Sequence, residues 1–350
     1  MTAIDFAARP LDVARRATLR LATRSHFLTR ILARRDSRIA VLAAIQIVLL
    51  FALSVRFPVA LFFLGPVLLG TVHLAADVRY LVLRRSVPRT LLATSVVAAL
   101  AITAVRVAVE THVLRNAVAE RVDVAIGTAW VGFALLGSLR AAPRVLALPI
   151  LIVVGALLVR HAHAVEISLV HLHNVIAVVV WLVLFRPISR WTALPLVLLV
   201  LFGTALLSGV TLPWTVAHGG DIAFGMHAEN LARWLAPGWS LETALALTAG
   251  FVFLQGVHYA TWIGWIPQED LPGQGTPTFR MTLRSLIHDF GSVGLAVIVA
   301  IALALIGIAL RDVRTSLVWY MTLAKSHAWF EGALVVHFLA SGKRMRARAG

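Results

Sequence analysis

The chain has 350 residues, of which 60% are apolar and 14% are charged, and its mean hydropathy is +0.88. This composition excludes a disordered chain and almost any soluble enzyme, and the absence of cysteine excludes a disulfide framework and a Cys-based zinc site. The net charge of +16 would favour nucleic-acid binding in a soluble protein. In a chain this apolar it predicts a membrane protein without a nucleic-acid partner, whose basic residues set its topology.

Residues 1–38 are predicted to form a basic amphipathic segment on the cytoplasmic side. Between residues 13 and 38, leucine, isoleucine and phenylalanine alternate with arginine. A helix of this kind lies on the inner leaflet and binds anionic lipid headgroups, so membrane lipid is the first predicted partner. The basic region is too long for a signal peptide, and no small-residue cleavage site follows it.

Apolar runs of about 20 residues, long enough to span a bilayer, recur along the rest of the chain. They predict an all-α, polytopic integral-membrane bundle of about ten helices, with one multi-pass domain over 39–340 and a basic tail over 341–350. Most of the 32 Lys and Arg residues fall in alternate connecting segments. By the positive-inside rule both termini are then cytoplasmic, in a bacterial-type inner (plasma) membrane. The predicted spans are 39–56, 58–83, 90–109, 122–139, 145–159, 164–185, 191–210, 241–266, 290–310 and 317–340.

The predicted outer loop 211–240 carries three tryptophans, Trp214, Trp234 and Trp239. Tryptophan is enriched at the membrane–water interface. The loop therefore favours an interfacial re-entrant segment, and a substrate gate is the alternative.

Histidines and acids inside the apolar spans are the candidate site residues, because ionisable groups in a membrane interior are costly and mark functional sites. His73 and Asp77 lie four residues apart, as do His327 and Glu331, so each pair shares one helix face. Counted at ~1.5 Å per residue, these groups share a slab from the midplane toward the cytoplasmic side. The complete set is His73, His173, His258, His327 and His337 as metal ligands, and Asp77, Tyr259 and Glu331 as catalytic groups.

Imidazole and carboxylate ligands without cysteine suit a non-haem iron centre best, although another divalent metal is possible. His73, His258 and His327 are the first expected ligands, with His173 or His337 as a fourth. The alternative is that the histidines are structural hydrogen-bonding groups between helices. In that case Asp77 would pair with a nearby arginine, and Lys325 with Glu331 or a lipid phosphate.

Three short patches resemble the Brp/Blh family of bacterial and archaeal membrane β-carotene dioxygenases. The His73–Asp77 pair in VHLAAD is similar to the family's early His and Asp, and His258 in GVHYATW to its later aromatic-rich helix. His327 and Glu331 in SHAWFEG are similar to its C-terminal His and acid. The family's early Pro-His-Gly motif and the second histidine after His258 have no match. The resemblance implies histidine-bound iron and cleavage of a carotenoid.

Three functions are consistent with the sequence. The first is an integral-membrane, histidine-ligated metal oxidoreductase, an iron dioxygenase acting on an apolar small molecule such as a carotenoid. The second is a proton- or metal-ion-coupled transporter or channel that uses the intramembrane histidines and acids. The third is a non-catalytic membrane scaffold that acts through its Arg-rich arm. If the histidine side chains lie close together in the fold, the metal enzyme is favoured over the scaffold. The sequence does not indicate an oligomeric state.

Overall fold

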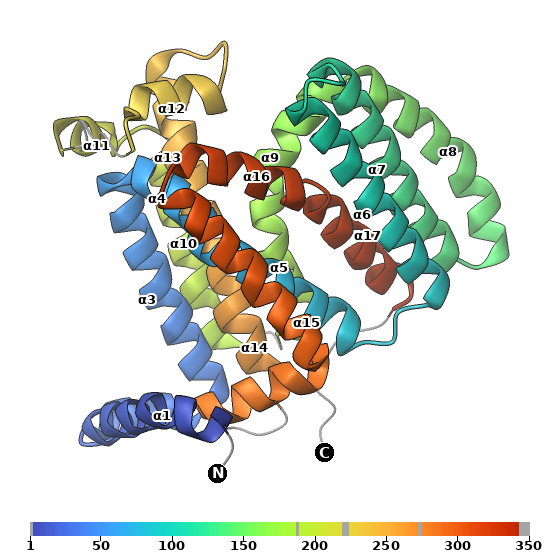
Figure 1. The fold of residues 1–350 in the computed structure, drawn as a ribbon. Coiled ribbons are helices and arrows are strands. Elements are labelled where there is room, and N and C mark those ends of the chain that lie inside the picture. Colours follow the sequence, from blue (N-terminus) through green and yellow to red (C-terminus); the bar gives the residue numbers. More distant parts are fainter. Residues whose placement is uncertain (1–2, 187–188, 219–223, 272–274, 343–350) are drawn as a thin grey trace. The chain divides into compact units, whose positions relative to one another are not determined.

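The computed structural model describes residues 3–186, 189–218, 224–271 and 275–342, and these residues form helices and connecting segments with no β-strand (Figure 1). The predicted all-α helix bundle is confirmed. A helix satisfies its own backbone N–H and C=O groups, as an apolar segment in lipid requires. The chain divides into two compact units. Unit 1 contains the described residues of 1–84 and 185–304, and unit 2 contains those of 85–184 and 305–345.

Unit 1 is built around α13 (Leu241–Ala260), most of which is buried. This helix packs against α3 (Arg35–Arg56) and α10 (Ala193–Leu207). Gly256 of α13 makes the approach to α3 possible, because the side chain of Leu50 occupies the place of a Cβ atom there. The other elements of unit 1 are α1 (Ala3–Ala22), α2 (His26–Ala33), α4 (Pro58–Gly65), η1 (Pro66–Gly70), α5 (Thr71–Asp77), η2 (Val78–Leu83), η4 (Arg190–Thr192), α11 (Leu212–His218), α12 (Ala228–Leu235), η5 (Thr261–Trp265) and α14 (Ile266–Glu269).

Unit 2 is built around α7 (Asn116–Ser138), which packs against four helices. These are α6 (Arg89–Glu110), α8 (Ala141–Arg160), α9 (Ala162–Val180) and α17 (His327–Ala340). Trp130 of α7 is buried, and its indole N–H donates to the hydroxyl of Ser95 on α6 at 3.1 Å. A buried tryptophan with its polar atom bonded in this way fixes the register between two apolar helices. The other elements of unit 2 are η3 (Trp181–Phe185, whose last residue belongs to unit 1) and α16 (Val313–Ala324).

Eight helical stretches among the described residues are long and apolar enough to cross a membrane. Several of these helices expose apolar side chains that a surrounding lipid bilayer would cover, which is compatible with a membrane protein. α8 has no buried residue, and Val145, Leu146 and Ile152 on it are 74%, 72% and 64% exposed. An apolar surface of this size is rare on soluble proteins. The eight stretches are Arg35–Arg56, Pro58–Leu83, Arg89–Glu110, Ala141–Arg160, Ala162–Phe185, Arg190–Leu207, Leu241–Glu269 and Phe279–Ala309.

Two of the ten predicted spans are not among these eight. The predicted span 122–139 corresponds to the larger part of α7, a 23-residue helix that ends at Ser138 and whose first half carries Arg121 and Asp123. The prediction of one continuous helix over 317–340 is wrong. The chain breaks at Lys325 and Ser326, which separate α16 from α17. At this break the ammonium group of Lys325 pairs with Glu166 of α9.

The long helix α15 (Phe279–Ala309) begins in unit 1, and its residues from Leu305 onward belong to unit 2. It contains a bend at Gly291, where φ is +71°. Glycine is the residue that adopts this left-handed conformation without a steric penalty. The predicted span 290–310 therefore corresponds to the part of α15 after the bend.

The two polar ends of the predicted membrane domain are described in part. The described residues of the segment 1–38 form α1, α2 and the first turn of α3, which begins at Arg35. The side chain of Ser25 caps α2 by accepting from the N–H of Leu28. Of the predicted tail 341–350, residues 343–350 lie outside the described residues. In the loop 211–240, the Trp234 ring packs against Phe62 at 5.6 Å between centroids.

Candidate functional site

Four of the five predicted metal ligands form two histidine pairs, one within each unit. His73 of α5 and His258 of α13 form the pair of unit 1, and His173 of α9 and His327 of α17 form the pair of unit 2. In both pairs, one histidine is followed four residues later by a buried carboxylate on the same helix face. These acids are Asp77 and Glu331.

The histidine pair of unit 1 is completely buried. The rings of His73 and His258 have their centroids 5.2 Å apart at an interplanar angle of 78°, and each residue is 1% exposed. The ring of Tyr259 lies 4.5 Å from that of His73. The structure therefore brings together three of the predicted site residues, from segments of sequence about 185 positions apart.

Wide π-helical turns surround this pair. The α5 helix that carries His73 lies between the π turns η1 and η2, and the π turn η5 follows directly on His258 and its helix α13. Turns of this kind are rare and often occur at functional sites. The hydropathy pattern of the sequence does not predict them. Pro66 at the start of η1 is the single hint that the sequence holds, because a proline inside a helix removes a backbone hydrogen bond.

The arginines close to Asp77 in sequence have partners other than Asp77. Arg79 donates to Asp289 at 2.6 Å, and Arg84 donates to both Asp270 and Asp289. Burial would lower the pKa of Arg84, but its hydrogen bonds with Asp270 and Asp289 raise the pKa above its ordinary value. These bonds join the end of η2 to α15, so the arginines have a structural role of their own.

The histidine pair of unit 2 has a defined tautomer. The rings of His173 and His327 have their centroids 5.8 Å apart at 89°. The Nδ1 atom of His173 lies 2.9 Å from the carbonyl oxygen of Leu169, and because a carbonyl only accepts, Nδ1 carries the proton. The lone pair of the neutral ring is then on Nε2, the arrangement typical of metal-bound histidines. The Nε2 atom of His327 lies 3.9 Å from a carboxylate oxygen of Glu331, which is fully buried.

The fifth predicted ligand, His337, lies away from this pair. It follows His327 by ten residues on α17, a rise of ~15 Å. Its Nδ1 atom lies 2.7 Å from the hydroxyl of Ser138, and that hydroxyl donates to the carbonyl of Ala134. The hydroxyl therefore accepts from Nδ1, and this bond joins α17 to α7; the place of His337 among the ligands stays a prediction.

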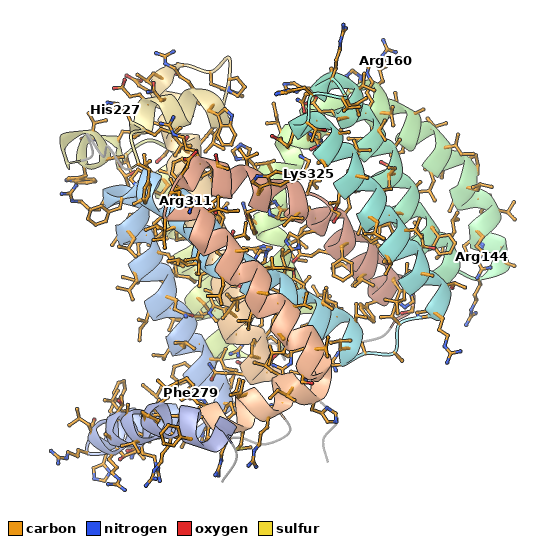
Figure 2. All side chains as sticks on the ribbon, in the orientation of Figure 1. Arg144, Arg160, His227, Phe279, Arg311 and Lys325 are labelled. Carbon is orange, nitrogen blue, oxygen red and sulfur yellow. The ribbon has the colours of Figure 1, made fainter. Side chains whose placement is uncertain are left out.

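Two buried acids and two half-buried basic residues of unit 2 form a cluster that the sequence did not predict, and we call it the unit 2 charge cluster. It contains Arg106 of α6, Asp123 of α7, Glu166 of α9 and Lys325 at the break before α17 (Figure 2 labels Lys325). Arg106 pairs with Asp123 and lies 3.6 Å from Glu166, which also pairs with Lys325. The two cations balance the two anions. The partner of Lys325 is therefore not the predicted Glu331 or a lipid phosphate but Glu166.

The buried histidines and acids carry the donor atoms that a metal site needs. They are His73, Asp77, His258, His327 and Glu331. Nitrogen and oxygen donors without sulfur suit iron, zinc, manganese or copper. The predicted set of His73, His258 and His327 combines residues of the two units, and it stays a prediction.

Comparison of the chain with protein-family models, with characterised proteins and with solved structures gives no match.

Proposed function

We propose that the protein is an integral-membrane metal-dependent oxidoreductase whose metal is bound by its buried histidines. The observation that supports this most is the repeated arrangement of the two histidine pairs. In each pair an imidazole with a carboxylate four residues later meets an imidazole from another helix. Burying such groups in a membrane costs several kcal/mol unless a charge or a metal compensates, and two unrelated structural contacts have no reason to repeat this pattern.

The donor set fits non-haem iron. The tautomer of His173 leaves Nε2 available for a metal, and the chain offers imidazole and carboxylate groups without a thiolate. Asp77 and Glu331 lie one helical turn from His73 and His327, where they can bind the metal or accept the second N–H of a ligand imidazole. A bound iron would supply redox chemistry with O₂ as the co-substrate.

The substrate we propose is an apolar small molecule that enters from the bilayer, such as a carotenoid. Its support is the resemblance to the Brp/Blh dioxygenases at His73, His258 and His327, together with helices whose apolar side chains are exposed. Tyr259, in contact with the ring of His73, is the aromatic group placed to orient such a substrate. The proposed location is a bacterial inner membrane with both termini in the cytoplasm, supported by the distribution of Lys and Arg.

Metal analysis of the purified protein tests this proposal. The wild type, expressed in iron-replete medium, is expected to carry stoichiometric iron, and His73→Ala, His258→Ala and His327→Ala to lose it. If a variant in either histidine pair loses all the iron, both pairs bind one ion. If a variant in each pair loses about half of the iron, the two pairs bind two ions. His163→Ala is the matched control, because this histidine is exposed and pairs with Glu120. His337→Ala is also expected to keep the iron, since ten residues of α17 separate its ring from that of His327.

A wild type that stays free of metal after reconstitution would contradict the proposed function. The second candidate, a proton- or ion-coupled transporter, is favoured by the unit 2 charge cluster, because buried charges between membrane helices also mark ion paths. Uptake driven by a pH gradient in proteoliposomes, with no metal bound, would decide for the transporter.

A further inference from the structure

The N-terminal helix α1 has one face that contacts unit 1. On this face Ala8 is 4% exposed, and the carboxylate of Asp12 accepts from the backbone N–H groups of Phe279 and Arg280 at 2.7 and 3.4 Å. Arg15 donates to the carbonyl oxygen of Thr276 at 2.8 Å. Asp12 thus caps the first turn of α15, whose N–H groups have no partner inside the helix. Figure 2 labels Phe279 at this junction.

The opposite face of α1 carries an exposed apolar row. Its residues follow one another at intervals of four, three, four and four, which places them on one side of a helix. Phe6, Val13 and Leu21 in this row are 74%, 51% and 65% exposed. At 100° per residue the row lies about half a turn from the face of Ala8, Asp12 and Arg15. The complete row is Phe6, Pro10, Val13, Ala17 and Leu21, and all five residues are exposed.

A row of basic residues runs along one edge of the apolar row. Arg9, Arg16 and Arg20 are exposed and lie on the same side of α1. The following helix α2 continues the pattern with Phe27, which is 71% exposed, and with Arg30. An apolar row bordered by arginine is the pattern of a helix that lies in the interface of an anionic membrane.

The position of α1 in unit 1 agrees with such an interface. α1 is anchored at the start of α15, and the chain passes through α2 directly into α3, so two of the long apolar helices begin beside it. α11 and α12, with the exposed Trp214 and Trp234, lie at the other end of unit 1 (Figure 1). Helices that cross a membrane begin where its surface lies.

We propose that α1 and α2 form a lipid-binding arm that lies on the membrane surface and is selective for anionic phospholipids. The apolar row enters the headgroup region, and Arg9, Arg16 and Arg20 bind lipid phosphates. A protein partner on this face is less favoured than lipid, because arginines at the inner membrane surface are attracted to the anionic headgroups beside them. The hydrogen bonds of Asp12 and Arg15 join the arm to the start of α15, so the arm and this long apolar helix are mechanically connected.

Single-cysteine labelling tests the arm, and it suits this chain because the chain has no cysteine of its own. Val13→Cys in the apolar row and Thr18→Cys, an exposed position away from the row, each take an environment-sensitive fluorophore. The full-length protein is placed in nanodiscs of phosphatidylcholine with and without phosphatidylglycerol. A blue shift is expected at position 13 and not at 18, larger with phosphatidylglycerol and reduced by salt.

The triple variant Arg9→Gln, Arg16→Gln and Arg20→Gln, combined with Val13→Cys, separates charge from burial. It is expected to lose the dependence on phosphatidylglycerol and to keep part of the blue shift from the apolar row. A label at position 13 that stays water-exposed in both nanodiscs would overturn the proposal and assign this face to a protein partner. An equal shift with and without phosphatidylglycerol would overturn its lipid selectivity. Neither outcome depends on metal binding.

Discussion

Replacing Lys325 with methionine is expected to lower the free energy of unfolding by about 3–5 kcal/mol, the usual cost of removing one partner of a buried ion pair. Lys325 pairs with Glu166, and their side chains are only 19% and 6% exposed. Without the ammonium group, the unit 2 charge cluster would hold two carboxylates against one guanidinium. The excess negative charge has little water to stabilise it, so the break between α16 and α17 would lose its anchor on α9.

Double variants show whether the ion pair itself is responsible. Glu166→Leu combined with Lys325→Met leaves Arg106 and Asp123 as a neutral pair, so this double variant is expected to be more stable than Lys325→Met alone. The charge exchange Glu166→Lys with Lys325→Glu is expected to recover part of the loss. Thermal and denaturant unfolding in detergent measure both, and Glu120→Gln, whose partner His163 is 71% exposed, is the control.

If the Lys325→Met variant unfolds at the same midpoint as the wild type, this explanation of the cluster is wrong. Hydrogen exchange over the first turn of α17 gives a second measurement. The exchange is expected to accelerate in Lys325→Met, because the break that positions His327 is no longer fixed to α9. This measurement needs no bound metal, so its result is independent of the proposed oxidoreductase activity.

Gly127→Ala is expected to lower the free energy of unfolding by about 1–3 kcal/mol, the range observed for overpacked cores. A Cβ atom at Gly127 of α7 would overlap the indole ring of Trp329 on α17. This ring is 8% exposed and rigid, so the helices would have to move apart. Trp329 lies two residues after His327, and the separation would also displace the histidine pair of unit 2.

Gly137→Ala is the matched control on the same helix. A Cβ atom at Gly137 meets no atom within 4 Å, so this substitution is expected to be neutral or to stabilise α7 by up to about 1 kcal/mol. Both variants are compared by unfolding in the same detergent. Equal stability of the two would show that α7 and α17 do not pack as closely at Gly127 as the structure has them.

The sequence was sufficient for the features that depend on local composition. Long apolar runs predicted spans such as α6 and α8, and the four-residue spacing placed Asp77 beside His73 on one face. The sequence was insufficient for features that depend on contacts between residues far apart in the chain. Lys325, at the break between α16 and α17, pairs with Glu166, more than 150 positions earlier, and hydropathy averages carry no information on such a partner.

The histidine pairs show the same limit. Nothing local distinguishes His173, which meets His327, from His337, which binds a serine hydroxyl on α7. The spacing of His327 and His337 along one helix could have separated them, because ten residues rise by ~15 Å, farther than two imidazoles can share one ion. The meeting of His73 with His258 required helix packing, and the π turns beside them have no sequence signature apart from Pro66.

The π turns have a consequence for how chains with this fold can vary in length. A π turn holds one residue more than an α turn, so each of η1, η2 and η5 amounts to a single-residue insertion inside a membrane helix. Losing that residue would rotate the rest of the helix by about 100° and turn part of its buried side outward. A gap of one residue next to His73 or His258 in a related chain would therefore mark the loss of this histidine pair, even where both histidines are still present.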